Sequence, residues 1–284
     1  RLDAFPLARC LDGSAPIYYI APGAERKKFI LFHEGGGFCG SIEDCQQRSQ
    51  GRLGSTSADG DSRLLSEPYF STDPLRNPLL HNWTKVFLRY CDGGYFSGNR
   101  ISPVMHNGTR LHFRGRHILK AVLDDLNLDR ATDVVIGGCS AGGIHVLAHL
   151  DMIRAMLPST VAVLGFAGSG FYTDVDSFTR RKRFVVSPDG QNASGSLSPA
   201  CTAAFPDANE KCLIAQRNAP FLRTPTFVWQ SKYDLDQRSC EMSPDCASSP
   251  TCVDAYSRRL SRAIHDELLN RGRPHTMRAS TAPL

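Results

Sequence analysis

The sequence lacks several features that mark common classes of protein. None of its apolar runs is long enough to cross a membrane, so we expect no membrane span. It has no C-x-x-C pair and no histidine pair at zinc spacing after a cysteine pair, which argues against a metal site. It also lacks internal repeats and low-complexity linkers. We therefore expect its 284 residues to form one domain, 1–284.

Positive charge is only mildly in excess over negative charge. The chain has 33 Lys and Arg against 28 Asp and Glu, a net charge of +5. Its one short basic cluster stands at residues 180–183. A nucleic-acid-binding surface is usually denser and more basic, so we expect no nucleic-acid partner and interpret the cluster as a solvated loop. A mild positive charge is compatible with a polyanionic substrate.

Cysteine, in contrast, is abundant for a cytosolic enzyme. Since metal is disfavoured, the ten cysteines indicate disulfides formed in an oxidising compartment. Three N-glycosylation sequons begin at Asn82, Asn107 and Asn192. Together these features predict a secreted glycoprotein. No signal peptide is visible at Arg1, so we expect a mature or truncated secreted chain.

Short apolar runs alternate with helical patterns along the chain. This alternation predicts an α/β fold with a mostly parallel sheet and helices on both faces. We interpret the polar stretch 176–219 as an irregular insertion over the sheet. The predicted strands are 29–32, 86–88, 134–136, 161–164 and 226–229, and the predicted helices are 117–128, 143–157 and 253–269.

The stretch VVIGGCSAGGIHVL, residues 134–147, places a serine on a tight turn. A buried strand ends at Ile136 and a helix begins at about Gly142, with Ser140 between them inside Gly138-x-Ser140-x-Gly142. This is the pattern of a nucleophile elbow, in which larger side chains two residues before or after the serine would collide with neighbouring strands. The alternative is a glycine-rich turn that only packs or holds a phosphate, although no P-loop lysine pattern is present.

A second glycine run follows an earlier strand, in the stretch LFHEGGGFCG, residues 31–40. Hydrolases with an elbow use such a loop to donate an oxyanion-hole N–H. Gly35, Gly36 and Gly37 allow the backbone to turn its N–H groups toward the site. A simple strand-to-helix loop is the alternative.

These residues resemble the pectin acetylesterase/Notum family of carboxylesterases, and the plant pectin acetylesterase branch is the nearer one. The matching stretches occur in family order and cover most of the chain from Cys10 to about Gly272. The resemblance assigns the oxyanion-hole N–H groups to Gly36, Gly37 and Ala141. The stretches are CLDGSAPIYYI (10–20), EGGGFC (34–39), RLGS (52–55), NWTKVFLRYCDGGYFSG (82–98), LHFRGRHILKAVLDDL (111–126), GCSAGG (138–143) and TPTFVWQSKYD (224–234).

The family implies an α/β-hydrolase fold and a Ser–Asp–His triad. Ser140 matches the nucleophile, and Asp234, in the loop after the strand 226–229, matches the acid. A hydrolase acid follows the serine in sequence and lies past a later strand, so the order of residues agrees. Asp236, two residues on, is the internal competitor, and a turn-forming role is the alternative for both aspartates.

The triad histidine of the family lies beyond a further helix and strand, in a cysteine-flanked motif that does not occur before Leu284. His265 falls within the last predicted helix, where we expect a surface residue. His275 has the right order but a different context, and we assign it no role. We expect either a fragment or a degenerate esterase, and little activity from the 284-residue chain itself.

The predicted function is a secreted carboxylic-ester hydrolase, extracellular or in the cell wall. It would remove acetyl esters from the polysaccharide pectin by acyl transfer at Ser140, and this chemistry needs no metal or organic cofactor. Two alternatives stay open. One is a fatty-acyl deacylase like Notum, and the other is a catalytically degenerate, carbohydrate-binding relative.

The resemblance also implies three disulfides. Cys139 is expected to be reduced, because the tight elbow leaves no room for a partner. Cys240, Cys246 and Cys252 form an odd group, of which one is expected to need a partner beyond Leu284. The implied pairs are Cys10–Cys91, Cys39–Cys45 and Cys201–Cys212.

Overall fold

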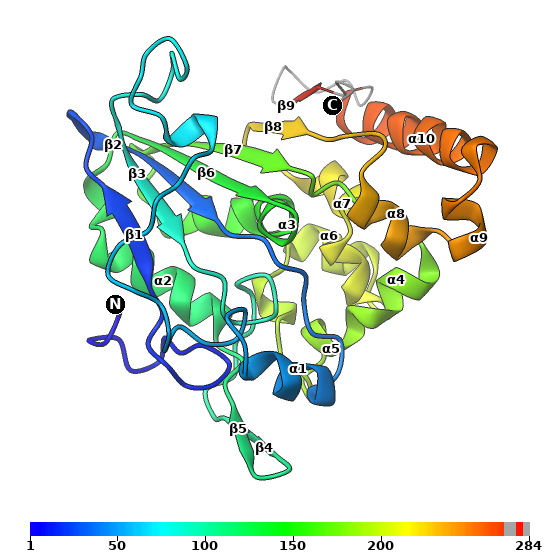
Figure 1. The fold of residues 1–284 in the computed structure, drawn as a ribbon, viewed down its shortest axis with the longest axis horizontal. Coiled ribbons are helices and arrows are strands. Elements are labelled where there is room, and N and C mark those ends of the chain that lie inside the picture. Colours follow the sequence, from blue (N-terminus) through cyan, green and yellow to red (C-terminus); the bar gives the residue numbers. More distant parts are fainter. Residues whose placement is uncertain (270–276, 281–284) are drawn as a thin grey trace.

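The computed structural model describes residues 1–269 and 277–280, which fold around a seven-stranded sheet (Figure 1). The strand order is β1-β3-β2-β6-β7-β8-β9. β1 pairs antiparallel with β3, and every other neighbouring pair in this sheet is parallel, which confirms the prediction. The strands are β1 (Tyr18–Ala21), β2 (Glu25–His33), β3 (Trp83–Leu88), β6 (Asp133–Cys139), β7 (Ala162–Gly168), β8 (Thr226–Trp229) and β9 (Met277–Ser280).

All five predicted strands are present. Each carries β-branched or aromatic residues, which suit a pleated and buried backbone. Four of the predicted runs lie inside β2, β3, β6 and β8, and the fifth overlaps β7. β6 is central, with Ile136 paired to Leu31 of β2 on one side and to Gly165 of β7 on the other. The parallel order brings the carboxyl ends of β2, β6, β7 and β8 to one edge of the sheet.

The three predicted helices are present as α2 (Gly115–Asp125), α3 (Ala141–Met156) and α10 (Pro250–Ile264). α3 packs on β6 and β7 and is apolar on nearly all sides, because it lies in the interior. A π-helical turn, His265–Leu269, continues α10. The other α-helices are α1 (Ile42–Ser49), α4 (Asp176–Arg181), α5 (Arg183–Val186), α6 (Pro199–Ala204), α7 (Ala215–Asn218), α8 (Leu235–Glu241) and α9 (Pro244–Ala247). The 3-10 helices are Pro68–Phe70, Leu128–Arg130, Ser194–Ser196, Asn209–Leu213 and Ala219–Phe221.

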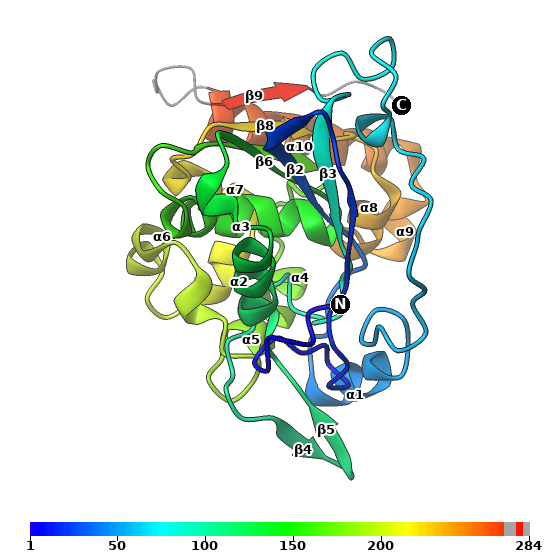
Figure 2. The same ribbon diagram turned by 90° about the vertical axis from the view of Figure 1, so that its left-hand side faces the viewer.

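The two faces of the sheet are covered differently. Side chains of α2, α3 and α10 join the large hydrophobic core on one face. On the other face, Phe70 of the first 3-10 helix packs with Phe32 and Phe87 in a smaller cluster. Leu164 of β7 and Phe227 of β8 are 47% and 40% exposed. A separate hairpin, β4 (Val104–His106) and β5 (Thr109–Leu111), projects from the body of the molecule (Figures 1 and 2).

The stretch 176–219 differs from the irregular insertion that the sequence suggested. It forms four short α-helices, α4 to α7, joined by turns and 3-10 helices. It also buries apolar side chains, among them Phe178, Val185 and Leu213, in the large core. Helices of four to six residues are too short to show a 3.6-residue hydrophobic period, which is why the pattern was not visible.

Candidate active site

Ser140 stands on the turn between β6 and α3, as the elbow pattern predicts. Its φ of 56° and ψ of −120° are unusual for a residue with a side chain. Its N–H donates to the carbonyl of Gly168 at 3.0 Å, which extends the pairing of β6 with β7 by one residue. A Cβ built on Gly138 would come within 2.4 Å of Gly142, and one built on Gly142 within 2.1 Å of the carbonyl oxygen of His33. Both glycines are therefore required by space.

The glycine loop after β2 packs directly on this turn. A Cβ on Gly35 would lie 3.1 Å from the Cβ of Ser140. Gly36 and Gly37 have φ values of 147° and 69°, which favour glycine. The carbonyl groups of both glycines are occupied by protein donors. Gly36 O accepts a hydrogen bond of 2.5 Å from the guanidinium of Arg48, and Gly37 O accepts one of 2.7 Å from the hydroxyl of Tyr90.

Three backbone N–H groups at this turn are available to a ligand. Within the described part of the chain, the N–H groups of Gly36, Gly37 and Ala141 donate to no protein acceptor. The first N–H groups of a helix lack partners inside the helix, and Ala141 is the first residue of α3. These are the N–H groups that the resemblance assigns to the oxyanion hole.

Asp234 lies in the loop after β8, at the same edge of the sheet. It caps α8, because its Oδ1 accepts a bond of 2.9 Å from the N–H of Gln237. Asp236 is exposed in the first turn of the same helix. Burial raises the pKa of the Cys139 thiol, and the negative charges of Asp234 and Asp236 raise that pKa further. Both carboxylates therefore act electrostatically on the elbow.

A buried polar network, which the sequence did not suggest, ties the loops after β7 and β8 together. The amide of Gln230 accepts from Phe171 N–H at 3.0 Å and donates to Gln237 at 2.9 Å. Glu241 accepts from the N–H of Thr173 at 2.7 Å, and burial raises the pKa of this glutamate. The network fixes the loop that carries Asp234 relative to the end of β7.

Three histidines form a buried row beside the elbow. The rings of His33 and His145 lie 4.2 Å apart, and those of His145 and His149 lie 5.1 Å apart. Each Nδ1 is hydrogen-bonded to a backbone carbonyl, of Gly137, Tyr95 and Ser196 in turn, at 2.8 to 3.0 Å. Burial lowers the pKa of His33 and of His149 to about 4, and it lowers the pKa of His145 well below its usual range.

No histidine of residues 1–269 is hydrogen-bonded to Ser140. His265 is exposed, as expected, and His275 lies outside the described residues. β9 pairs in parallel with β8, with Ser280 opposite Trp229. Since the two strands end level, the carboxyl end of β9 lies at the same edge of the sheet as Ser140 and Asp234.

The basic cluster 180–183 lies at the junction of α4 and α5 and not in a loop; its three arginines are exposed, as predicted, but Lys182 is not. Lys182 is fully buried, with its Nζ 2.5 Å from the hydroxyl of Tyr95 and within 4.6 Å of the ring centres of Tyr95, Phe38 and Phe178. Burial lowers the pKa of this lysine well below its usual range. The prediction was wrong for Lys182 because α4 and α5 turn this one residue of the cluster inward, against the aromatic residue that follows the glycine loop.

The three disulfides implied by the resemblance are present, and Cys139 is free, as expected. Of the last three cysteines one is left unpaired within the described residues, in line with their odd number, and its partner beyond Leu284 stays a prediction. Cys246 pairs with Cys252, and Cys240 is the second free cysteine. Their spacing of six residues spans the turn from α9 to α10, which brings the two sulfurs together.

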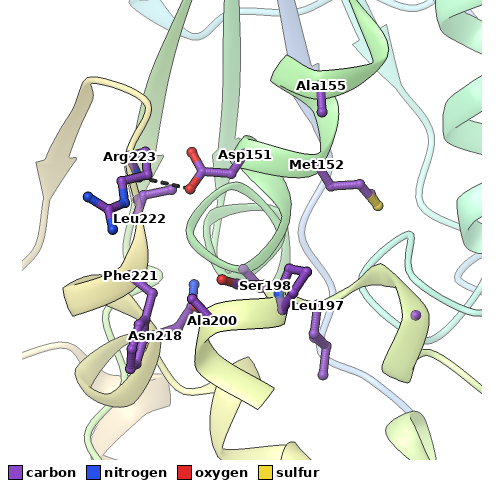
Figure 3. Close-up of a pocket in the computed structure, with 13 residues that line it drawn as sticks. Asp151, Met152, Ala155, Leu197, Ser198, Ala200, Asn218, Phe221, Leu222 and Arg223 are labelled. Carbon is purple, nitrogen blue, oxygen red and sulfur yellow. Dashed lines mark hydrogen bonds between the residues drawn. The ribbon is translucent and has the colours of Figure 1, made fainter. Parts of the chain in front are cut away.

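A pocket of about 450 Å³ lies elsewhere, between the second half of α3 and the segments 195–200 and 218–223 (Figure 3). The carboxylate of Asp151 on the pocket wall accepts hydrogen bonds from the backbone N–H groups of Arg223 and Thr224, each at 2.8 Å. The pocket begins at Ala148, eight residues along α3 from Ser140, or about 12 Å at 1.5 Å per residue. It is therefore separate from the elbow.

Residues 1–269 and 277–280 contain no group of three or more His, Cys, Asp or Glu side chains arranged to hold a metal ion. In the same residues no helix has both the length and the apolar character needed to cross a membrane.

A serine on a strained strand-to-helix turn, at the carboxyl edge of a mostly parallel sheet, defines an α/β-hydrolase-like fold. The solved structure of the Wnt deacylase Notum from Drosophila has the same fold, with a TM-score of 0.81 and 24% identity, over 96% of this chain and 81% of that one. The family model for pectinacetylesterase matches residues 3–263, and the chain belongs to this family.

Among curated relatives, pectin acetylesterases 5 and 4 of Arabidopsis thaliana are 34% and 35% identical over 84% of this chain. The palmitoleoyl-protein carboxylesterase NOTUM of Drosophila melanogaster is 30% identical over 92% of it. These alignments cover 57%, 59% and 41% of the relatives' own lengths, so the chain spans little more than half of the plant proteins.

Proposed function

We propose that this chain forms the core of a serine carboxylesterase that removes acetyl esters from pectin. The observation that carries the proposal is Ser140 at a φ of 56°, between two glycines that no larger residue can replace and against a glycine loop with unbonded N–H groups. A packing turn does not need donors that are left without acceptors. The family to which the chain belongs supports the same reaction class.

In the proposed reaction, Ser140 Oγ attacks the ester carbonyl carbon and its proton passes to a general base. The carbonyl oxygen becomes an oxyanion held by the N–H groups of Gly36, Gly37 and Ala141, with about 3–4 kcal/mol from each donor. The sugar hydroxyl leaves with the proton, and water then releases acetate from Ser140 by the same steps. Asp234 would orient the histidine base, which the resemblance to the family puts after a further helix and strand.

Two observations favour acetyl over a long fatty-acyl group. The aromatic rings of Phe38, Tyr95 and Phe178 close around Lys182 directly after the glycine loop, so this side of the loop is filled. The two plant pectin acetylesterases are also more similar in sequence than the Drosophila NOTUM protein. The net charge of +5 suits a polymer of galacturonate.

We also propose that the protein is secreted and glycosylated. Four disulfides support an oxidising compartment. Asn107 is exposed at the tip of the β4–β5 hairpin, whereas Asn82 and Asn192 are half-buried. Recovery of the protein from the culture medium with a glycan on Asn107 supports this proposal, and retention inside the cell without one contradicts it.

The activity is tested with the protein expressed from its complete coding sequence. We expect turnover of p-nitrophenyl acetate to exceed that of p-nitrophenyl palmitate, and Ser140→Ala to lower kcat by at least about a thousandfold. Ser169→Ala is the matched control, since Ser169 directly follows the neighbouring strand β7 and has a similar φ of 46°. Unchanged turnover in Ser140→Ala contradicts the proposal, and a preference for palmitate moves the substrate to fatty-acyl esters. Absence of turnover favours the degenerate, carbohydrate-binding alternative.

A further inference from the structure

Glu34, the residue before the glycine loop, holds three arginines at once. Its Oε1 accepts from Arg52 at 2.5 Å and from Arg63 at 3.2 Å. Its Oε2 accepts from Arg89 and from the N–H of Tyr90, the latter at 2.9 Å. Burial opposes ionisation of Glu34, but the Tyr90 bond and the charges of Arg89 and Arg52 outweigh it and lower the pKa of this carboxyl. Glu34 is therefore a carboxylate in the folded protein.

This cluster has more guanidinium groups than carboxylates. Arg89 is fully buried and is balanced by Glu34 on one side and by Asp59, at 2.9 Å, on the other. Arg52 and Arg63 are then two further guanidinium groups on one carboxylate oxygen. Three guanidinium groups face two carboxylates, which leaves one positive charge in excess.

The excess charge is accessible. The side chains of Arg52 and Arg63 are 57% and 34% exposed, whereas that of Arg89 is not exposed. Within the described residues, Arg52 and Arg63 each donate one hydrogen bond, both to Glu34. A guanidinium has five N–H donors, so most of theirs remain for a ligand. The guanidinium of Arg63 also stacks over the ring of Phe87, 4.7 Å from its centre, which restrains it.

Contacts of the loop place the cluster beside Ser140. Leu53, next to Arg52 in sequence, would approach a Cβ on Gly36 to 2.6 Å. Gly35 follows Glu34 directly and packs on Ser140. Glu34, which binds the arginines, and the proposed oxyanion donors Gly36 and Gly37 thus belong to one short segment of the chain, residues 34–37.

We propose that Arg52 and Arg63 bind the carboxylate of a uronate residue next to the acetylated sugar of the substrate. This inference rests on the proposed function and adds a specificity-determining subsite to it. A guanidinium binds a carboxylate through two parallel N–H donors, and two guanidinium groups already restrained by Glu34 and Phe87 lose little freedom when they do so. A uronate polymer supplies such a carboxylate on every sugar ring.

Binding, rather than turnover, tests the subsite. The probe is an unacetylated oligogalacturonate, titrated calorimetrically into the protein at low salt. We expect Arg52→Gln and Arg63→Gln each to weaken binding about tenfold, in line with the loss of one charge-assisted hydrogen-bonded contact. The matched control is Arg258→Gln on α10, since Arg258 is 58% exposed and pairs with the single carboxylate of Asp254. It should bind the probe like the unmodified protein.

The fully methyl-esterified oligogalacturonate, which carries no charge, should bind the unmodified protein and the two arginine variants equally. Thermal unfolding of each variant shows that it is folded. Unchanged binding of the charged probe by both arginine variants overturns the subsite. Equal weakening in Arg258→Gln also overturns it, because the attraction is then a diffuse effect of net charge. Specific binding without esterase activity leaves the subsite standing and rejects the proposed reaction, so the two failures are distinguishable.

Discussion

A Cβ atom on Gly35 would stand 3.1 Å from the Cβ of Ser140 and 2.5 Å from the carbonyl oxygen of Cys139. The second distance is shorter than any ordinary contact with a backbone atom. The glycine loop and the serine turn are therefore built in contact, and neither can move without the other.

This contact predicts that Gly35→Ala displaces the turn. We expect a loss of about 1–3 kcal/mol in the free energy of unfolding from overpacking, together with a loss of esterase activity of tenfold or more. Gly37→Ala is the comparison. A Cβ there meets nothing within 4 Å, so it adds only the backbone cost of its φ of 69°, about 1 kcal/mol. Urea unfolding and turnover of a small acetyl ester measure both effects. Equal behaviour of the two variants would show that the contact has no such role.

The assignment of the acid predicts different effects for two neighbouring aspartates. Asp234→Asn should lower kcat by about a thousandfold or more, since the neutral amide no longer stabilises a protonated histidine. Asp236→Asn, on the exposed turn of α8, should lower it by less than about tenfold. Steady-state kinetics on the complete protein decide between them, and the opposite order of effects would transfer the role to Asp236.

The buried histidine row predicts loss of stability in mild acid. With pKa values lowered from 6.5 to about 4, His33 and His149 are neutral in the folded chain at pH values where the unfolded chain binds protons. The free energy of unfolding should be largest above pH 6.5 and fall as the pH approaches 4. Each of the two histidines contributes a loss of up to about 3 kcal/mol.

Urea unfolding across this pH range measures the slope. His149→Asn should reduce it, because an asparagine amide can still donate to the carbonyl of Ser196 but does not titrate. His265→Asn, at an exposed position, should leave it unchanged. A slope that is the same in His149→Asn as in the unmodified protein would mean that His149 is not the titrating group.

The cysteine pairing predicts two free thiols. All ten cysteines lie within residues 1–269, and four disulfides use eight of them. Thiol titration in denaturant without reductant should therefore give two thiols per chain, Cys139 and Cys240, and ten after reduction. Peptide mapping identifies them. Four thiols before reduction, or Cys139 in a bridge, would contradict this assignment.

Local sequence patterns predicted much of this fold. The strand 134–136, the glycines around Ser140 and the helix that follows are adjacent in sequence, so their pattern predicted the turn directly. The long helices α2 and α10 have apolar residues at helical spacing and were predicted for the same reason. The resemblance to a known family added the three disulfides that the structure contains.

What the sequence determined by itself is the alternation of five of the strands with the helices α2, α3 and α10, and the presence of a serine on a strained turn. Each of these depends on residues within a few positions of one another. Only the tertiary structure decided which distant side chains meet. Glu34 joins Arg52, Arg63 and Arg89 from separate segments, and Lys182 is buried although its neighbours in sequence are exposed. Such contacts depend on how the elements pack against one another, and hydrophobic periodicity, which indicates helices and strands, does not predict them.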